Sequence, residues 1–206
     1  MKSYGPLNKY QLKRIEQTID KALVEYPRVL AVRVDLHMPA RRILCDMLTA
    51  DDFARIDAAA ISWFTASFKE KLKNHQLKLK KEGKRIRKTS SRFMWSREFC
   101  SSSYKKHYHI LLLLNRDAFN SLGSFESDNG TLLCLIREAW MSAIGLIYPK
   151  NKELVEIPEN PCYYINAKNG KQSEAYRKLI YRTSYFAKEK SKCFTDGERN
   201  FGCSLK

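Results

Sequence analysis

Residues 104–114 read YKKHYHILLLL, in which two histidines two positions apart are followed by five consecutive apolar residues. Successive side chains of a β-strand point to opposite faces, so an unbroken apolar run indicates a strand that is buried on both faces. The pattern predicts a strand in the middle of a sheet. The imidazoles of His107 and His109 are expected side by side on one face of it, near its beginning.

The segments around this strand predict a hairpin and a wider sheet. Residues 92–99 form a strand candidate, and the short, serine-rich connection at residues 100–103 indicates an antiparallel hairpin with residues 104–114. Residues 29–37, which are rich in β-branched side chains and precede Pro39, predict another strand. Short strands are expected at residues 154–157 and 162–165, and helices at 9–24, from Thr49 to near Gly83, at 132–147 and at 173–190.

These elements predict one α+β domain over residues 1–206. Because the central strands are joined by a short turn, we expect an antiparallel sheet of about five strands, with helices packed mainly on one face. The part that carries the motifs spans about residues 28–192. Residues from about 194 to 206 contain two glycines and predict a flexible C-terminal tail.

The charge of the chain favours one class of partner. Its 206 residues include 38 Lys or Arg and 22 Asp or Glu, a formal net charge of +16. Such an excess attracts polyanions, so nucleic acid is favoured over the alternative, a basic protein whose charge serves solubility alone. The apolar run at residues 110–114 is too short to cross a bilayer, and the N-terminal residues resemble no secretory signal. We expect a cytoplasmic protein with no membrane partner.

The histidine pair predicts part of a metal site. Two neighbouring imidazoles on a rigid strand supply two ligands for a divalent cation. Across the predicted hairpin, Glu98 comes nearly opposite His107 and would add a carboxylate oxygen, which favours Mg²⁺ or Mn²⁺. Three protein ligands leave positions for a phosphate oxygen. The alternative is that His107 and His109 are ordinary polar residues at the end of a strand.

A second signal lies near the C-terminus. On the predicted helix, Tyr181, Tyr185, Lys188 and Lys192 fall on a single face, because they follow each other at helical spacing. A phenol with a pKa of about 10 is a poor nucleophile at neutral pH, but a neighbouring cation and a polarised phosphate make its attack feasible. The alternative is an amphipathic helix with half-buried tyrosines and solvated lysines.

Residues 78–88 hold seven cations and one acid, which predicts a surface that follows DNA phosphates close to the site. The alternative is a solvated helix end with a flexible loop. Tyr104 and the two lysines before the histidines are expected to guide a single strand by stacking and charge. The predicted DNA contacts are Lys80, Lys81, Lys84, Arg85, Arg87, Lys88, Lys105 and Lys106.

Taken together, the motifs resemble the HUH endonuclease superfamily, and within it the filamentous-phage (inovirus) replication initiators and the YagK/YfjJ C-terminal domain. The match lies in RVLAVRVDL (28–36), WSRE (95–98) leading to HYHILLLLN (107–115), and SYFAK (184–188), in that order. The resemblance places the first of these segments on a strand beside the histidines, where Asp35 would approach the site. It implies a single-strand nickase and ligase that starts rolling-circle replication of a phage or mobile element in a bacterial host.

The resemblance also implies roles for individual residues. His107, His109 and Glu98 are the implied metal ligands, Tyr185 the nucleophile that forms a 5′-phosphotyrosyl link, and Lys188 its electrostatic partner. Tyr181 is either a second nucleophile or a packing residue, and packing is favoured. No P-loop motif occurs, so a host helicase and polymerase are expected partners of the origin DNA complex, and no small-molecule substrate is expected. The rival functions are a non-catalytic DNA-binding regulator and an RNA-binding module.

Overall fold

The sheet is built around β3 (Lys106–Asn115), the strand predicted from the histidine pair and the apolar run. The computed structural model describes residues 5–39, 50–100, 105–190 and 192–204, with the backbone alone for residues 50–58. The other elements are α1 (Lys9–Glu25), β1 (Arg28–His37), α2 (Ala50–Lys81), β2 (Arg92–Phe99), α3 (Leu132–Ala143), β4 (Val155–Glu156), β5 (Cys162–Asn166), α4 (Glu174–Ser184) and β6 (Phe201–Cys203), with 3₁₀ turns η1 (Lys152–Leu154), η2 (Ala167–Asn169) and η3 (Tyr185–Ala187).

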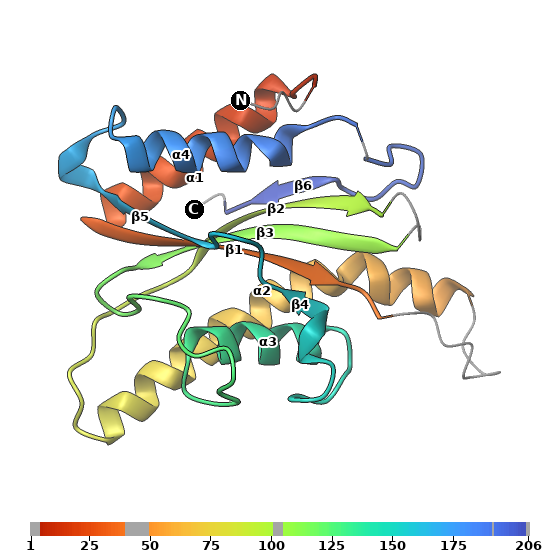
Figure 1. The fold of residues 1–206 in the computed structure, drawn as a ribbon. Coiled ribbons are helices and arrows are strands. Elements are labelled where there is room, and N and C mark those ends of the chain that lie inside the picture. The colour runs from red at the N-terminus through yellow and green to blue at the C-terminus, as the bar shows by residue number, and fades with distance from the viewer. Residues whose placement is uncertain (1–4, 40–49, 101–104, 191, 205–206) are drawn as a thin grey trace.

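All strand pairs are antiparallel, and β3 lies between β1 and β2. The order across the sheet is β4-β1-β3-β2-β6, and β5 also pairs with the outer edge of β1 (Figure 1). The prediction of an α+β fold with an antiparallel sheet is therefore confirmed, with six strands in the sheet. The β2–β3 hairpin also has the predicted register, since Glu98 lies opposite His107.

The helices cover both faces of the sheet, and the prediction that they pack mainly on one face is wrong (Figure 1). On one face Leu112 of β3 belongs to a core with Phe64 of α2 and Trp140 of α3. On the other face Leu111 belongs to a core with Ile19 of α1 and with residues of α4. A strand that is apolar on both sides requires a helical layer on each of them, which the unbroken run of leucines already implied.

Local signals explain where most helices begin and end. The side chain of Asn8 caps α1 by accepting from the Gln11 amide at 3.0 Å. Helix α3 ends at Ala143 rather than Ile147, because Gly145 adopts φ = 72°, the left-handed conformation that terminates helices. Helix α4 ends earlier than predicted, at Ser184, and the extended backbone that follows the η3 turn makes a β-bridge with the N-terminal segment.

The C-terminal segment, predicted as a flexible tail, is part of the fold. Residues 201–203 form β6 and pair with β2 at the edge of the sheet. A side chain at Gly202 would meet Trp95, whose ring atoms lie 2.6 Å from the position of a Cβ. Arg97 of β2 has a side chain that is 1% exposed, and it donates to both oxygens of Asp196 at 2.7 and 2.8 Å and to Asn200. A buried guanidinium requires such partners, and the tail supplies them.

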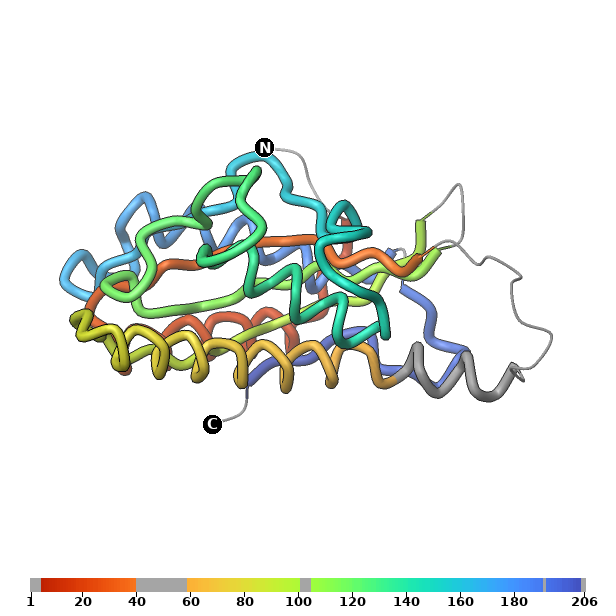
Figure 2. The backbone as a smooth tube through the Cα atoms, turned by 90° about the horizontal axis from the view of Figure 1, so that it is seen from below, coloured from red at the N-terminus to blue at the C-terminus, as the bar shows by residue number. Residues whose placement is uncertain are grey.

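The molecule is elongated along α2, which runs beside most of the sheet (Figure 2). The amino-terminal end of β3 and the carboxyl-terminal end of α2 lie at opposite ends of the molecule. Among the described residues, no helix combines the length and the hydropathy that a membrane span requires.

Candidate active site

Strand β3 presents His107 and His109 on the face of the sheet that α1 and α4 cover. Leu111 and Leu113 point to the same face of β3, because they follow the histidines at intervals of two residues, and they belong to the core on that face. The two imidazole rings have centroids 4.8 Å apart and an angle of 81° between their planes. The imidazoles thus lie side by side, as the periodicity of a strand predicts.

Glu98 reaches the two histidines from β2. It lies directly opposite His107 in the hairpin and is 3% exposed. One ligand atom from each of the three residues can be chosen so that all lie within 4.8 Å of one another. One carboxylate oxygen, Oε2, lies 3.7 Å from Nε2 of His109. The cluster therefore has the two imidazoles and one carboxylate of the predicted metal site.

The orientation of His109 is set from β1. Asp35 lies opposite His109 in the sheet, and its Oδ1 is 2.7 Å from Nδ1 of the imidazole. An ionised carboxylate can only accept, so Nδ1 carries a proton, and in the neutral imidazole Nε2 holds the lone pair. Nε2 is buried, and no residue in the described part of the chain forms a hydrogen bond with it. A carboxylate behind an imidazole is the arrangement that orients metal-binding histidines.

Arg33 balances the charge of this buried pair. Its Nη2 is 3.4 Å from Oδ2 of Asp35 and 3.2 Å from Nδ1 of His109. Because the guanidinium and the Nδ1–H are both donors, the favourable contact of Arg33 is the one with Asp35. Burial acts to raise the pKa of Asp35, but the hydrogen bond from His109 and the charge of Arg33 outweigh it and hold this pKa below its ordinary value.

The two imidazoles have different proton affinities. Burial lowers the pKa of His107, and the positive charge that His109 can carry lowers it further. Burial also opposes protonation of His109, but the hydrogen bond with Asp35 and the nearby carboxylate of Glu98 outweigh it and raise its pKa. His107 is therefore neutral at pH 7, the form in which an imidazole binds a metal ion.

Tyr185 brings the predicted phenol to the same cluster. It lies in the η3 turn directly after α4, where the buried side chains of Phe186 and Ala187 anchor the chain in the core. Its hydroxyl donates to Oε2 of Glu98 at 3.0 Å. Its ring lies edge-on to that of His109, with centroids 5.2 Å apart. Three segments distant in sequence thus meet at one end of the sheet.

Lys188 is the cation next to the phenol. Its Nζ lies 3.4 Å from the Tyr185 hydroxyl and 4.7 Å from the centre of the ring. Burial and the negative charge of Glu98 together raise the pKa of Tyr185 well above its usual range. The phenol is therefore protonated near pH 7, with Glu98 as the acceptor of its hydrogen bond.

Lys192 is a second, half-buried cation on this side of the site. Its ammonium donates to Oε1 of Gln11 at 2.8 Å and to the carbonyl oxygen of Phe186 at 2.5 Å. Burial lowers the pKa of Lys192 to about 8, although the charge of Glu98 opposes the shift. The sequence predicted Lys192 on one helical face with Tyr185, but the α-helix ends at Ser184, before both residues.

Comparison with known proteins places the chain in a family. A sequence profile of the YagK/YfjJ C-terminal domain matches residues 1–204. The chain belongs to this family. It is similar to the uncharacterized protein YfjJ of Escherichia coli K12, with 37% identity over 194 residues that cover 93% of this chain and 91% of YfjJ. It is also similar to the uncharacterized protein YagK of that organism, with 35% identity over 208 residues, covering 99% and 98%. No solved structure matches the chain.

In this member of the YagK/YfjJ family, the two tyrosines of the helix occupy different structures. Tyr181 lies within α4, one turn before the helix ends, and is half-buried. Tyr185 lies beyond the helix, where the 3₁₀ turn brings its hydroxyl to Glu98. The regular helical face that the sequence predicted for both tyrosines therefore ends between them.

The predicted DNA contacts next to the histidines divide into two kinds. Lys105 is exposed. Lys106 is buried, and its ammonium donates to both oxygens of Glu198 at 3.2 and 3.0 Å. The charge of Lys106 is balanced within this YagK/YfjJ-type fold, because Glu198 of the C-terminal segment pairs with it. The prediction that Lys106 guides DNA is not supported by this environment.

The basic stretch at residues 78–88 does not lie close to the histidines. Asn115, at the far end of β3, donates from its backbone to the Thr89 hydroxyl at 3.0 Å and from its side chain to the Lys88 carbonyl at 2.9 Å. Eight residues of extended strand separate Asn115 from His107, a distance of about 27 Å. A contact of this stretch with DNA would therefore be remote from Tyr185, contrary to the expectation that it holds DNA beside the site.

Sequence reasoning missed Arg33 and gave Asp35 only an approximate place. Both are charged residues within the apolar run of β1. A buried charge needs a partner, so their position in this run could have indicated that they pair with other polar groups in the fold. His37 ends β1 opposite His107, and the two rings stack with centroids 5.5 Å apart. Its Nε2 lies 2.9 Å from a carboxylate oxygen of Glu156 in β4.

Proposed function

We propose that this protein is a metal-dependent endonuclease that nicks and rejoins one DNA strand through a 5′-phosphotyrosyl intermediate at Tyr185. The observation that carries the proposal is the hydrogen bond of 3.0 Å from the Tyr185 hydroxyl to Glu98, which also belongs to the cluster with His107 and His109. A phenol, a cation and a set of metal ligands within one small volume suit attack on a phosphodiester.

The donor set fits a divalent cation. His107 and His109 offer imidazole nitrogens, and Glu98 offers a carboxylate oxygen. Mn²⁺ binds both kinds of ligand, whereas Mg²⁺ prefers oxygen ligands, so Mn²⁺ fits this set better than Mg²⁺ does. The lone pair on Nε2 of His109 is buried and directed by Asp35, as expected of a ligand. A cation held by these residues would withdraw negative charge from a non-bridging oxygen of the scissile phosphate.

The residues of the chain account for the remaining parts of the reaction. The Tyr185 oxygen forms a bond to phosphorus while the bond from phosphorus to the 3′ oxygen breaks, and the phenolic proton is lost as the 3′ hydroxyl gains one. Glu98 lies within hydrogen-bond distance to accept this proton, and the Lys188 ammonium, 3.4 Å away, stabilises the charge that develops on the phenol oxygen. Reversal onto another 3′ hydroxyl rejoins a strand.

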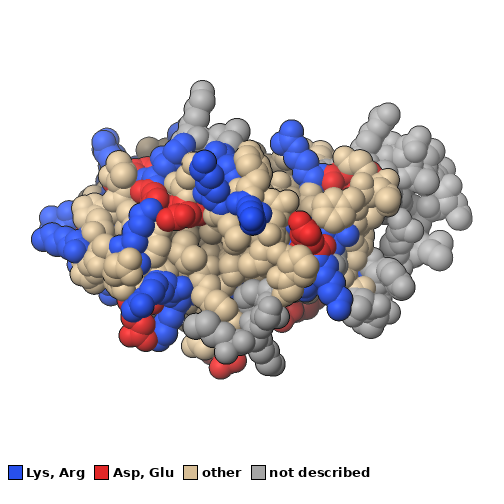
Figure 3. All heavy atoms as spheres, turned by 90° about the horizontal axis from the view of Figure 1, so that it is seen from above, with Lys and Arg blue, Asp and Glu red and all other residues tan. Residues whose placement is uncertain are grey.

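The surface suits a nucleic acid. On the side that carries α1 and α4, which also carries the site, cationic side chains form several groups among fewer acidic ones (Figure 3). The proposed biological role is the start of rolling-circle replication of a phage or mobile element in the cytoplasm of a bacterial host. In that role the 3′ hydroxyl primes a host polymerase, and a host helicase separates the strands.

The test is the formation of a covalent protein–DNA adduct. Wild-type protein is incubated with Mn²⁺ or Mg²⁺ and single-stranded DNA covering the replication origin of the element that encodes it, and is then analysed by denaturing electrophoresis. Adduct is expected with wild type and with Tyr181→Phe, and is expected to disappear with Tyr185→Phe or with a chelator. DNA binding that ignores the chelator, without adduct under any condition, would instead identify a non-catalytic DNA-binding regulator.

A further inference from the structure

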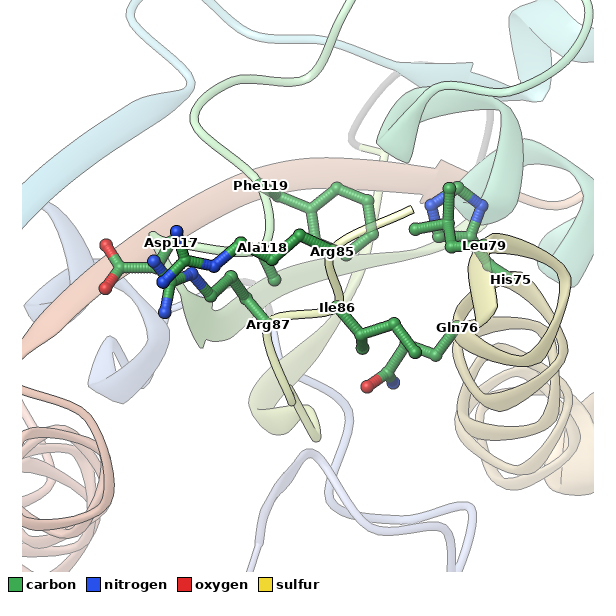
Figure 4. A pocket seen from close by; sticks show the side chains of 9 residues that line it. All are labelled: His75, Gln76, Leu79, Arg85, Ile86, Arg87, Asp117, Ala118 and Phe119. Atoms are coloured by element: carbon green, nitrogen blue, oxygen red, sulfur yellow. The ribbon is translucent and has the colours of Figure 1, made fainter. Parts of the chain in front are cut away.

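A small cleft lies at the end of the sheet opposite to the histidines, and we refer to it as the far-end cleft (Figure 4). Its walls are the last turns of α2 with His75, the extended segment after α2 with Arg85 and Arg87, and the loop after β3 with Asp117 and Phe119. Its volume is about 50 Å³. This is the space of roughly three to five water molecules and is enough to admit a phosphate group.

The frame of the far-end cleft is rigid. The side-chain amide of Gln76 donates to the Thr89 carbonyl at 2.9 Å and accepts from the Thr89 amide at 3.2 Å. At the other end, the amide of Lys84 donates to the carbonyl of Leu79 at 3.0 Å. The segment at residues 84–88 is thus fastened to α2 at both ends. Its cations are presented on a preformed surface, so little conformational entropy is lost when a ligand binds.

The cations of the cleft are available to a ligand. Arg85 and Arg87 are exposed, and no described carboxylate lies within ion-pair distance of either. Figure 4 shows both side chains extending along the same wall. The acid at the rim, Asp117, is engaged by Arg28 at 2.6 Å. Two guanidinium groups free to make paired hydrogen bonds are suited to phosphate oxygens.

The opposite wall is neutral. The ring of His75 stacks on Phe119, with centroids 5.5 Å apart and an angle of 29° between the planes. Burial and the charge of Lys78 hold the pKa of His75 below its ordinary value, so it carries no charge at pH 7. Attraction of an anion to the cleft therefore depends on the arginines and on the exposed lysines that flank them.

We propose that the far-end cleft binds the backbone of the duplex that adjoins the nicked strand, with Arg85 and Arg87 each contacting a phosphate. The inference rests on the proposed function, since it takes the strand at Tyr185 to be single and the DNA beyond it to be paired. His107 and Asn115, which lie at the two ends of β3, are about 27 Å apart along the strand, a length of about eight base-pair steps of 3.4 Å. Duplex DNA is stiff over this length, because its persistence length is about 50 nm.

Stiffness is the reason why a duplex fits better than a single strand. Two rigid contact points at a fixed distance can both be occupied by a rigid polymer without further ordering. A flexible strand would first have to be extended, which costs conformational entropy. The site would then measure the distance from the nick to the nearest paired region, and thereby contribute to the choice of origin.

The experiment compares two double variants that each remove two positive charges. Arg85→Gln/Arg87→Gln alters the far-end cleft, whereas Lys69→Gln/Lys150→Gln alters exposed cations that lie outside the cleft and outside α1 and α4. The affinity of the full chain is measured by fluorescence anisotropy in chelator over a series of salt concentrations. The two probes are a 20-base-pair duplex with a single-stranded extension and the extension alone.

For the probe with the duplex, the cleft variant is expected to bind about tenfold more weakly at low salt, with a salt slope reduced by about two. The control variant and the single strand are expected to change less than about threefold. Equal losses with both variants, or an equal loss on the single strand, would overturn the proposal.

Adduct formation on the shortest single strand that wild type still nicks is expected to be unchanged by the cleft variant. Because binding is measured without metal, absence of any adduct would refute the nicking function and leave the test of the cleft intact.

Discussion

The two ends of β3 use charged residues in opposite ways. At the end with His107 and His109, the charged side chains of the neighbouring strands are buried, and each contacts a charged or hydrogen-bonding partner. At the end with Asn115, the cations of residues 84–88 are exposed, and most have no acidic partner in the described part of the chain.

This difference indicates that the two ends of β3 serve different purposes, catalysis at one and attraction of DNA at the other. A charge inside the protein must be paired to offset its desolvation, and pairing fixes its position. A charge in solvent acts over a Debye length of about 8 Å and loses its effect as salt increases. Substitutions at the histidine end should therefore change metal binding, catalysis or stability, and substitutions at the other end should change salt-dependent affinity alone.

The largest effect is expected from His107→Ala. Loss of a residue that hydrogen-bonds to a metal ligand lowers metal affinity by about 10- to 100-fold, and loss of a ligand itself should lower it further. Mn²⁺ binding, measured by isothermal titration calorimetry, is expected to fall by more than 100-fold. His107 is only half-buried, so the fold should tolerate the change.

His75→Ala is the matched control for this prediction, because it removes a histidine from the opposite end of the sheet. It is expected to leave Mn²⁺ affinity unchanged. Equal affinity of wild type and His107→Ala, or equal losses with both variants, would show that the cluster at Glu98 is not the metal site.

The sequence was sufficient for the hairpin but not for the wider network. The register that sets Glu98 opposite His107 follows from a connection of few residues, which leaves little freedom in pairing. The contact of Asp35 with His109 depends instead on β1 lying beside β3, although α2 and β2 separate them in the chain. Residue patterns carry little information on such non-sequential neighbours, and here the placement came from the family resemblance.

The second effect is on stability, through Arg97→Met. This side chain is buried and paired with Asp196 and Glu198. Removing one member of a buried ion pair costs about 3–5 kcal/mol, but here the acids are partly exposed, so we expect about 2–3 kcal/mol. The free energy of unfolding is measured in urea, with the exposed Arg177→Met as the control. A loss below about 0.5 kcal/mol, the usual scale for surface substitutions, would mean that the C-terminal segment is not clamped.

The failure to predict this clamp has a physical origin. A tail with two glycines and few apolar residues has the composition of a mobile end, and nothing local indicates order. Its order comes from the need of Arg97 for acceptors, which is visible only when the burial of Arg97 is known. The same holds for the basic stretch, whose distance from Tyr185 depends on the direction in which α2 runs.

A smaller effect is expected from Asp35→Asn. The amide oxygen can still accept from Nδ1 of His109, so the orientation of the ring is kept while the negative charge behind it is lost. The basicity of Nε2 falls, and Mn²⁺ affinity should decrease by about 10- to 100-fold. Calorimetric titration measures the change, and circular dichroism shows whether the fold is retained. An unchanged affinity in folded protein would mean that Asp35 does not tune His109.

The smallest effects are expected from two adjacent lysines. One is exposed and the other is buried and paired, so they repeat the difference between the two ends of β3. Lys105 is exposed, so Lys105→Gln should reduce the salt slope of DNA binding by about one and leave stability within about 0.5 kcal/mol. Lys106 is buried and paired with Glu198, so Lys106→Gln should lower stability by about 1 kcal/mol and leave the slope unchanged. Anisotropy and urea unfolding of both variants decide this. A reduced slope for Lys106→Gln would show that the C-terminal segment releases Lys106 when DNA binds, because its charge is otherwise neutralised within the fold.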